Sequence, residues 1–238
     1  MARYFIGTSG WVYPHWRGLF YPEGVSQARW LELYCRNFST VELNNSFYHL
    51  PSEGAFLRWK ETTPPGFRFS VKVSRLITHL KKLRNVEAPL ENFLSRARLL
   101  GEKLGPLLYQ LPPQMPKDLA LLEAFLRLLP RDLGHVFEFR NQAWLTDEVY
   151  EILGLYGMGF CIYDMPGLTT PGIATASYAY VRFHGSAGLY SSRYSDGELV
   201  AWAGKIKALP AQTVYIYFNN DAEAHAVANA RALAQLLA

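Results

Sequence analysis

The chain has 238 residues, of which 50% are hydrophobic and 18% charged, so it can bury one large core and is too apolar for an intrinsically disordered protein. The net charge of +4 and the pI near 9.0 suit an anionic ligand but are too small to require nucleic acid. No apolar run reaches the ~18 residues that span a bilayer, and Met1–Ile6 enters a strand at once, which leaves no room for a signal peptide. The two distant cysteines, Cys35 and Cys161, are typical of a reduced compartment. We therefore expect one cytoplasmic domain over residues 1–238, without a membrane anchor.

Short β-rich runs alternate with helical patterns along the whole chain. The expected strands are Arg3–Thr8, Thr40–Asn44, Phe67–Val73, Pro106–Gln110, His135–Phe139, Gly159–Asp164, Tyr178–His184 and Thr213–Asn219. Several of them are almost continuous apolar runs, as is typical of parallel strands that are covered on both faces.

The segments between these strands have helical spacing and recognisable starts. The expected helices are Gln27–Asn37, Ser52–Glu61, Ala88–Leu104, Lys117–Leu129, Thr146–Tyr156, Ser195–Ala208 and Asp221–Leu237. Ser195, with Glu198 three residues later, has the pattern of a capping box. Residues Met165–Ser177 are rich in Pro, Gly and Thr, so we expect a loop there instead of a helix.

This alternation predicts parallel strands joined by right-handed crossovers, and eight such strands predict closure of the sheet. The expected fold is a TIM (β/α)8-type barrel with a loop in place of a full helix between strands six and seven. A doubly wound open sheet is the main alternative, but no Gly-x-Gly-x-x-Gly follows the first strand.

Polar residues gather at the carboxyl ends of the expected strands. They are Glu42, Asn44, Ser70, Lys72, Gln110, Glu138, Arg140, Asp164, Arg182, His184, Asn219 and Asn220. Pairs spaced i, i+2 share one face of a strand, and the loops at this end of a barrel build active sites. We therefore expect many of these side chains to face a hydrated pocket. The alternative is a structural ion-pair network in which acids and bases nearly balance.

Several motifs spread over the whole chain occur together. They are Gly7-Thr8-Ser9-Gly10-Trp11-x-Tyr13-x-x-Trp16-x-Gly18-x-Phe20-Tyr21-Pro22, Thr40-Val41-Glu42-Leu43-Asn44-x-x-Phe47-Tyr48-x-x-Pro51, Phe69-x-Val71-Lys72-x-x-x-x-Ile77-Thr78-His79, Gln110-Leu111-Pro112-Pro113, Glu138-Phe139-Arg140-x-x-x-Trp144, Arg182-Phe183-His184-Gly185 and Tyr217-Phe218-Asn219-Asn220-Asp221. In this combination the sequence resembles the YecE-like family, the domain of unknown function numbered 72. The resemblance implies a TIM-barrel fold and supplies no activity.

The residue types favour an enzyme, a hydrolase or an isomerase or lyase, that acts by acid/base chemistry on a small phosphate- or carboxylate-bearing molecule. Basic side chains would neutralise the anion, and a carboxylate would act as general base with a histidine or a second carboxyl as acid. The expected catalytic residues are Glu42, Lys72, Glu138, Asp164 and His184. The expected ligand contacts are Asn44, Tyr48, His79, Gln110, Arg140, Arg182, Asn219 and Asn220. This hypothesis needs no cofactor.

Two alternatives stay open. One is a metal-dependent hydrolase, acting for example on nucleic acid, in which Mg²⁺, Mn²⁺ or zinc would bind Glu42, Glu138, Asp164 and His184. The cations among the expected site residues argue against this metal. The other is a non-catalytic module whose aromatic rings stack on a base, a sugar or a flavin-like ring. Those rings are Trp11, Tyr13, Trp16, Tyr21, Phe47, Tyr48, Trp144, Tyr190 and Tyr194. The sequence gives no information about protein partners.

Overall fold

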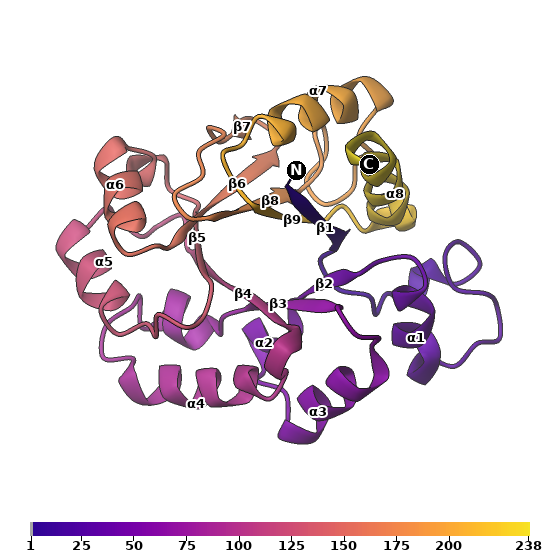
Figure 1. The fold of residues 1–238 in the computed structure, drawn as a ribbon, viewed down its shortest axis with the longest axis horizontal. Helices are drawn as coiled ribbons and strands as arrows, with labels where there is room; N and C mark the ends of the chain where they lie inside the picture. Colours follow the sequence, from indigo (N-terminus) through magenta and orange to yellow (C-terminus); the bar gives the residue numbers. More distant parts are fainter. Residues whose placement is uncertain (1) are drawn as a thin grey trace.

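Eight parallel strands follow one another around a nearly closed barrel (Figure 1). In the computed structural model, which describes residues 2–238, they are β1 (Arg3–Thr8), β2 (Thr40–Leu43), β3 (Arg68–Lys72), β4 (Leu104–Leu111), β5 (His135–Phe139), β6 (Gly159–Met165), β8 (Tyr178–Phe183) and β9 (Thr213–Phe218). Their hydrogen-bonded order is β1-β9-β8-β6-β5-β4-β3-β2. The predicted TIM-type barrel is confirmed.

Helices form a ring outside the barrel (Figure 1). They are α1 (Trp30–Cys35), α2 (Asn45–Tyr48), α3 (Glu53–Thr62), α4 (Glu87–Arg98), α5 (Leu119–Leu126), α6 (Asp147–Leu155), α7 (Asp196–Lys207) and α8 (His225–Leu237). The loop predicted after β6 is present and contains only the two-residue strand β7 (Leu168–Thr169), which pairs antiparallel with β6. The helix expected to reach Leu104 ends at Arg98, because Gly101 adopts a φ of 55° and Leu104 already begins β4.

The seam between β1 and β2 is closed by a side chain, because these two strands do not form a full ladder of backbone hydrogen bonds. The Tyr34 hydroxyl accepts a hydrogen bond from the Thr8 amide at 2.9 Å and donates one to the Thr40 carbonyl at 3.0 Å. A Cβ at Gly7 would lie 2.2 Å from the Thr40 carbonyl oxygen, so only glycine permits this approach. One strand bridge, between Ser9 and Glu42, completes the ring.

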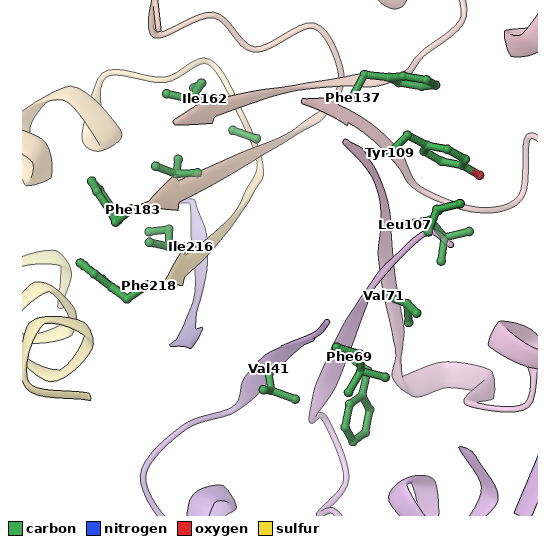
Figure 2. Packing of buried hydrophobic residues seen from close by; sticks show 14 of the residues in the cluster. Val41, Phe69, Val71, Leu107, Tyr109, Phe137, Ile162, Phe183, Ile216 and Phe218 are labelled. Atoms are coloured by element: carbon green, nitrogen blue, oxygen red, sulfur yellow. The ribbon is translucent and has the colours of Figure 1, made fainter. Parts of the chain in front are cut away.

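Alternate strand residues pack on the two sides of the barrel wall. Figure 2 shows the outward set, which includes Val41, Phe69, Phe137, Ile162 and Phe218, packed in the hydrophobic core under the helices. The neighbouring residues face the barrel axis, where a second buried cluster forms from Leu108, Val136, Cys161, Tyr180 and Tyr217. Polar residues two positions further along the strands therefore lie one layer nearer the carboxyl end. None of the helices described is long and apolar enough to cross a membrane.

Candidate functional site

Arg182 on β8 lies between two carboxylates in the layer above the inner cluster. Its Nη2 atom is 2.8 Å from Glu42 Oε1 on β2, and its Nη1 atom is 2.5 Å from Glu138 Oε2 on β5. All three side chains are buried, with at most 1% of each exposed. Buried charges are tolerated only when they are paired, and here the pairing crosses the barrel.

Glu42 is held by three donors. Besides Arg182, its carboxylate accepts hydrogen bonds from the Ser9 hydroxyl at 2.7 Å and the Tyr180 hydroxyl at 2.6 Å. Tyr180 is not among the site residues predicted from the sequence, although its i, i+2 spacing from Arg182 places both side chains on one face of β8. The three donors and complete burial suit Glu42 to a structural tie across the β1–β2 seam.

A second chain of contacts leads from Glu138 toward the carboxyl end of the barrel. The Arg140 Nε atom donates to Glu138 Oε1, and Arg140 Nη2 lies 2.8 Å from His184 Nε2. On the other side of the imidazole, Nδ1 lies 3.2 Å from the Asn219 amide group. Arg140 keeps 9% of its side-chain surface exposed, so this chain of contacts extends from a buried carboxylate to the rim. We call Glu42, Glu138, Arg140 and Arg182 the buried charge group.

Electrostatics keep Glu138 ionised and the adjacent His184 neutral. Burial alone would raise the pKa of Glu138, but Arg140 and Arg182 outweigh it and hold that pKa well below its usual range. Burial, followed by repulsion from Arg182 and Arg140, lowers the pKa of His184 well below its usual range. Two carboxylates then face two guanidinium groups beside a neutral imidazole, so the charges of the group balance.

Lys72 occupies a different environment at the end of β3. Its Nζ atom lies 4.2 Å from the centre of the Phe47 ring, and the side chain is partly exposed. Among residues 2–238 this nitrogen has no hydrogen-bond or ion-pair partner within bonding distance. Burial, reinforced by the nearby charge of Arg182, lowers the pKa of Lys72 to about 8. Lys72 is therefore a cation without a directly bonded counter-charge, and the carboxylates of Glu138 and Glu42 attract it only from farther away.

His79 lies against the same aromatic ring. It belongs to a short π-helix, Leu76–Leu80, a rare conformation that is frequent at functional sites. Its ring meets the Phe47 ring nearly at right angles with centroids 4.9 Å apart, and its Nδ1 atom lies 2.9 Å from the Thr78 hydroxyl. Burial, then Lys72 and Arg75, lower the pKa of His79 to about 4. We call Phe47, Lys72 and His79 the rim group.

Two residues predicted for the site face elsewhere. Asp164 follows the inward Tyr163 on β6, so its side chain points outward, where it accepts hydrogen bonds from the Thr169 hydroxyl and, at 2.8 Å, from the Tyr194 hydroxyl. Asn220 is buried and donates to the Ser192 carbonyl at 2.9 Å and to Asn229 Oδ1 at 3.0 Å. Both residues anchor loops, and the structure does not bring them to the other predicted site residues.

The remaining predicted contacts lie around the mouth without direct bonds to the buried charge group. Gln110 on β4 is partly exposed and is in register with Glu138 on β5. Asn44 begins the turn into α2 in a helical conformation, where strand alternation no longer applies, and its Oδ1 atom is buried without a partner in the described part of the chain. Tyr48 on α2 is 62% exposed.

Most of the rings considered for ligand stacking are committed to the core. The buried ones are Trp11, Trp16, Tyr21, Phe47, Trp144 and Tyr194. Only Tyr48 and Tyr190 are substantially exposed, and Tyr190 lies edge-on to the His184 ring at 5.5 Å. A broad aromatic stacking surface, which the binding-module hypothesis needs, is therefore not formed by the rings named for it.

The residues named for a metal do not form a coordination set. Arg182 separates the carboxylates of Glu42 and Glu138, and Asp164 points away from both. Within residues 2–238, no three His, Cys, Asp or Glu side chains gather in a way that would hold a metal ion.

The parallel barrel and the polar residues at the carboxyl ends of its strands define a TIM-barrel protein with a candidate site at the mouth. Its sequence matches the family described as protein of unknown function DUF72 over residues 5–238, and the chain belongs to that family. This confirms the family resemblance inferred from the motifs.

Relatives and solved structures agree with this assignment. The UPF0759 protein YecE of Escherichia coli K12 is 35% identical over 138 residues, which are 58% of this chain and 48% of that protein, so the match spans about half of that relative. The UPF0759 protein YunF of Bacillus subtilis is 27% identical and aligns with 98% of this chain and 94% of its own. A DUF72 family crystal structure from Thermotoga maritima has a TM-score of 0.88 at 30% identity, with 99% of each chain covered. One from Enterococcus faecalis has a TM-score of 0.84 at 20% identity, with 100% of this chain and 95% of that chain covered, and shows the same fold.

Proposed function

We propose that this protein is an enzyme that binds a small anionic molecule at the carboxyl end of the barrel and acts on it by acid/base chemistry at Lys72. The observation that carries the proposal is the position of Lys72, a partly buried cation with an aromatic ring beneath it and no directly bonded counter-charge among residues 2–238. The buried charge group beside it is balanced, so Lys72 gives the mouth a surplus positive charge. A carboxylate or phosphate is the complementary ligand.

Arg140 offers a second donor to the same ligand. Its Nη1 atom lies 3.0 Å from the sulfur of Met165, which is a weak acceptor. An anionic oxygen is a stronger acceptor, so it would replace the sulfur contact with little loss of binding free energy. Arg140 would then hold the anionic group while its Nε atom stays bonded to Glu138.

Proton transfer at Lys72 is matched to neutral conditions. A general acid or base works best when its pKa lies near the working pH, and the pKa of Lys72 is about 8. His79, with a pKa of about 4, is a neutral base at pH 7 and lies against the same Phe47 ring. We therefore assign proton transfer to Lys72 and His79, anion binding to Arg140 and Lys72, and support of Arg140 to Glu138.

The proposal is tested by titrating the protein with inorganic phosphate and with small mono- and dicarboxylates, using calorimetry and thermal unfolding. A ligand at 100 times its Kd should stabilise the protein by about 2.7 kcal/mol. Lys72→Met should weaken the best ligand by about tenfold or more, since a charge-assisted contact is lost. Lys207→Met, which removes an exposed lysine from α7, is the matched control and should not change binding. Equal affinity of Lys72→Met and the unmodified protein would exclude this ligand site.

A further inference from the structure

We propose that Lys72 is a nucleophile that forms an imine with the aldehyde or ketone carbonyl of a small anionic substrate. This inference rests on the proposed function, because Arg140 and the surplus charge of the mouth would hold the substrate's anionic group. It adds the substrate class, a carbonyl compound with a carboxylate or phosphate, and a covalent step.

The environment of Lys72 differs from that of Lys103 and Lys117, which have acceptors or an acid, and from that of Lys205, which also lies over a ring, that of Trp202, but is exposed. Lys103 is buried and donates to the Lys60 carbonyl at 2.5 Å and to the Thr63 hydroxyl at 3.2 Å. Lys117 pairs with Glu148 at 3.4 Å. An acceptor or an acid holds the proton on an ammonium group, whereas the Lys72 nitrogen faces the Phe47 ring and has no such partner among the described residues.

A lysine becomes a nucleophile when desolvation and a neighbouring cation favour its neutral amine. Both act on Lys72: the side chain is partly buried, and the guanidinium of Arg182 repels its positive charge. With a pKa of about 8, about a tenth of the side chain is neutral at pH 7, against well under a hundredth for a lysine of ordinary pKa. The position at the end of a barrel strand leaves this amine at the mouth.

The reaction balances without an oxidant or a reductant. The Lys72 Nζ lone pair forms a C–N bond to the carbonyl carbon, and the C=O π electrons move to the oxygen, which takes up a proton as the nitrogen loses one. The nitrogen lone pair of this carbinolamine then forms C=N while the C–O bond breaks, and the hydroxyl leaves as water after protonation. His79 is the neutral base that relays the first proton from the nitrogen to the alkoxide oxygen. It then gives a proton taken from solvent to the departing hydroxyl, and the protonated imine returns its remaining nitrogen proton to solvent, so the net products are one imine and one water.

The test uses glyoxylate, an anionic aldehyde, and glycolaldehyde, a neutral aldehyde with the same two-carbon skeleton, each with sodium cyanoborohydride at pH 7. Reduction converts an imine into a stable secondary amine, whose position is read by mass spectrometry of tryptic peptides. We expect glyoxylate to modify Lys72 at least about tenfold faster than Lys207, and at least about tenfold faster than glycolaldehyde modifies Lys72.

Lys72→Arg separates the covalent step from anion binding, because arginine keeps the charge but forms no imine under these conditions. It should retain calorimetric binding of phosphate within a few-fold and lose the adduct. His79→Gln should slow adduct formation without weakening phosphate binding. Phosphate binding without preferential modification of Lys72 would overturn the imine and leave the proposed function intact. Preferential modification of Lys72 by glycolaldehyde and glyoxylate alike would overturn the anionic substrate class, and absence of any anion binding would remove the proposed function itself.

Discussion

Two sets of charged residues lie at the same end of the barrel and differ in one respect. In the buried charge group every charge has an opposite charge within 3 Å, as between Arg182 and Glu42 or Glu138. In the rim group, no opposite charge of residues 2–238 lies within bonding distance of the Lys72 Nζ atom, which faces the Phe47 ring. Pairing decides what each set can do: compensated charges hold strands together, and the uncompensated cation is available to a ligand. Apart from Arg140, which also contacts the ligand in the proposed function, the first set should stabilise the barrel and the second should bind the ligand.

The largest expected effect comes from Arg182→Met. The substitution leaves two buried carboxylates without their shared cation, so the free energy of unfolding should fall by about 3–5 kcal/mol. Urea denaturation at pH 7 measures this loss. Arg75→Met, at an exposed position after β3, is the control and should change stability by less than about 0.5 kcal/mol. A loss below about 1 kcal/mol for Arg182→Met would mean that the buried group does not stabilise the barrel.

The pH dependence of stability tests the same group in another way. The pKa of Glu138 is lower in the folded protein than its ordinary value of 4.5, so the unfolded chain binds more protons below that pH. The stability from this carboxylate is therefore complete above pH 4.5 and is lost as the pH falls further, by about 1.4 kcal/mol per pH unit. Glu138→Gln should remove this part of the slope in denaturation curves recorded between pH 7 and pH 3. An unchanged slope would assign the acid sensitivity to other carboxyls.

The fold was accessible from the sequence because its signals are local. Apolar runs predict buried parallel strands, and the capping box at Ser195 and Glu198 is present as predicted. The spacing from Val136 to Glu138 and from Tyr180 to Arg182 also places the charges above the inner cluster. Such signals depend only on neighbouring residues, so they can be recognised without knowledge of the tertiary structure.

The site was less accessible from the sequence. The position of a residue in a strand does not show which side of the barrel wall its side chain faces or which residue it pairs with. Asp164 is the penultimate residue of β6, as Arg182 is of β8, yet the alternation of β6 turns Asp164 outward. The donors to Glu42 come from Ser9 and Tyr180, which are far away in the chain. The lowered pKa of Lys72 likewise depends on burial and on Arg182, and neither is encoded in the residues next to it.

Lys72→Met should have a smaller effect on stability, and of opposite sign. The pKa of Lys72 falls from 10.5 to about 8 on folding, so the folded protein binds this proton less tightly and a charged Lys72 destabilises it at pH 7. The free energy of unfolding of the variant should be about 1 kcal/mol higher at pH 7, after allowance for solvent screening at a partly exposed site. The gain should shrink between pH 8 and pH 10.5, because there the folded protein has released this proton while the unfolded chain still binds it, so the stability of the unmodified protein rises. Paired denaturation curves at pH 7 and pH 10 measure it, and a destabilised variant would contradict an uncompensated charge.

Asp164→Asn should have the smallest effect on anion binding by the rim group. Its carboxylate lies on the outer side of β6 and accepts from Tyr194 at 2.8 Å, so loss of the charge weakens one loop anchor by about 1 kcal/mol. Anion affinity measured by calorimetry should change by less than about twofold, whereas Lys72→Met should reduce it by about tenfold or more. The two substitutions remove single charges from strand ends of the same barrel. If Asp164→Asn altered affinity as much as Lys72→Met, binding would depend on the total charge at this end of the molecule, and the distinction between paired and unpaired residues would lose its functional meaning.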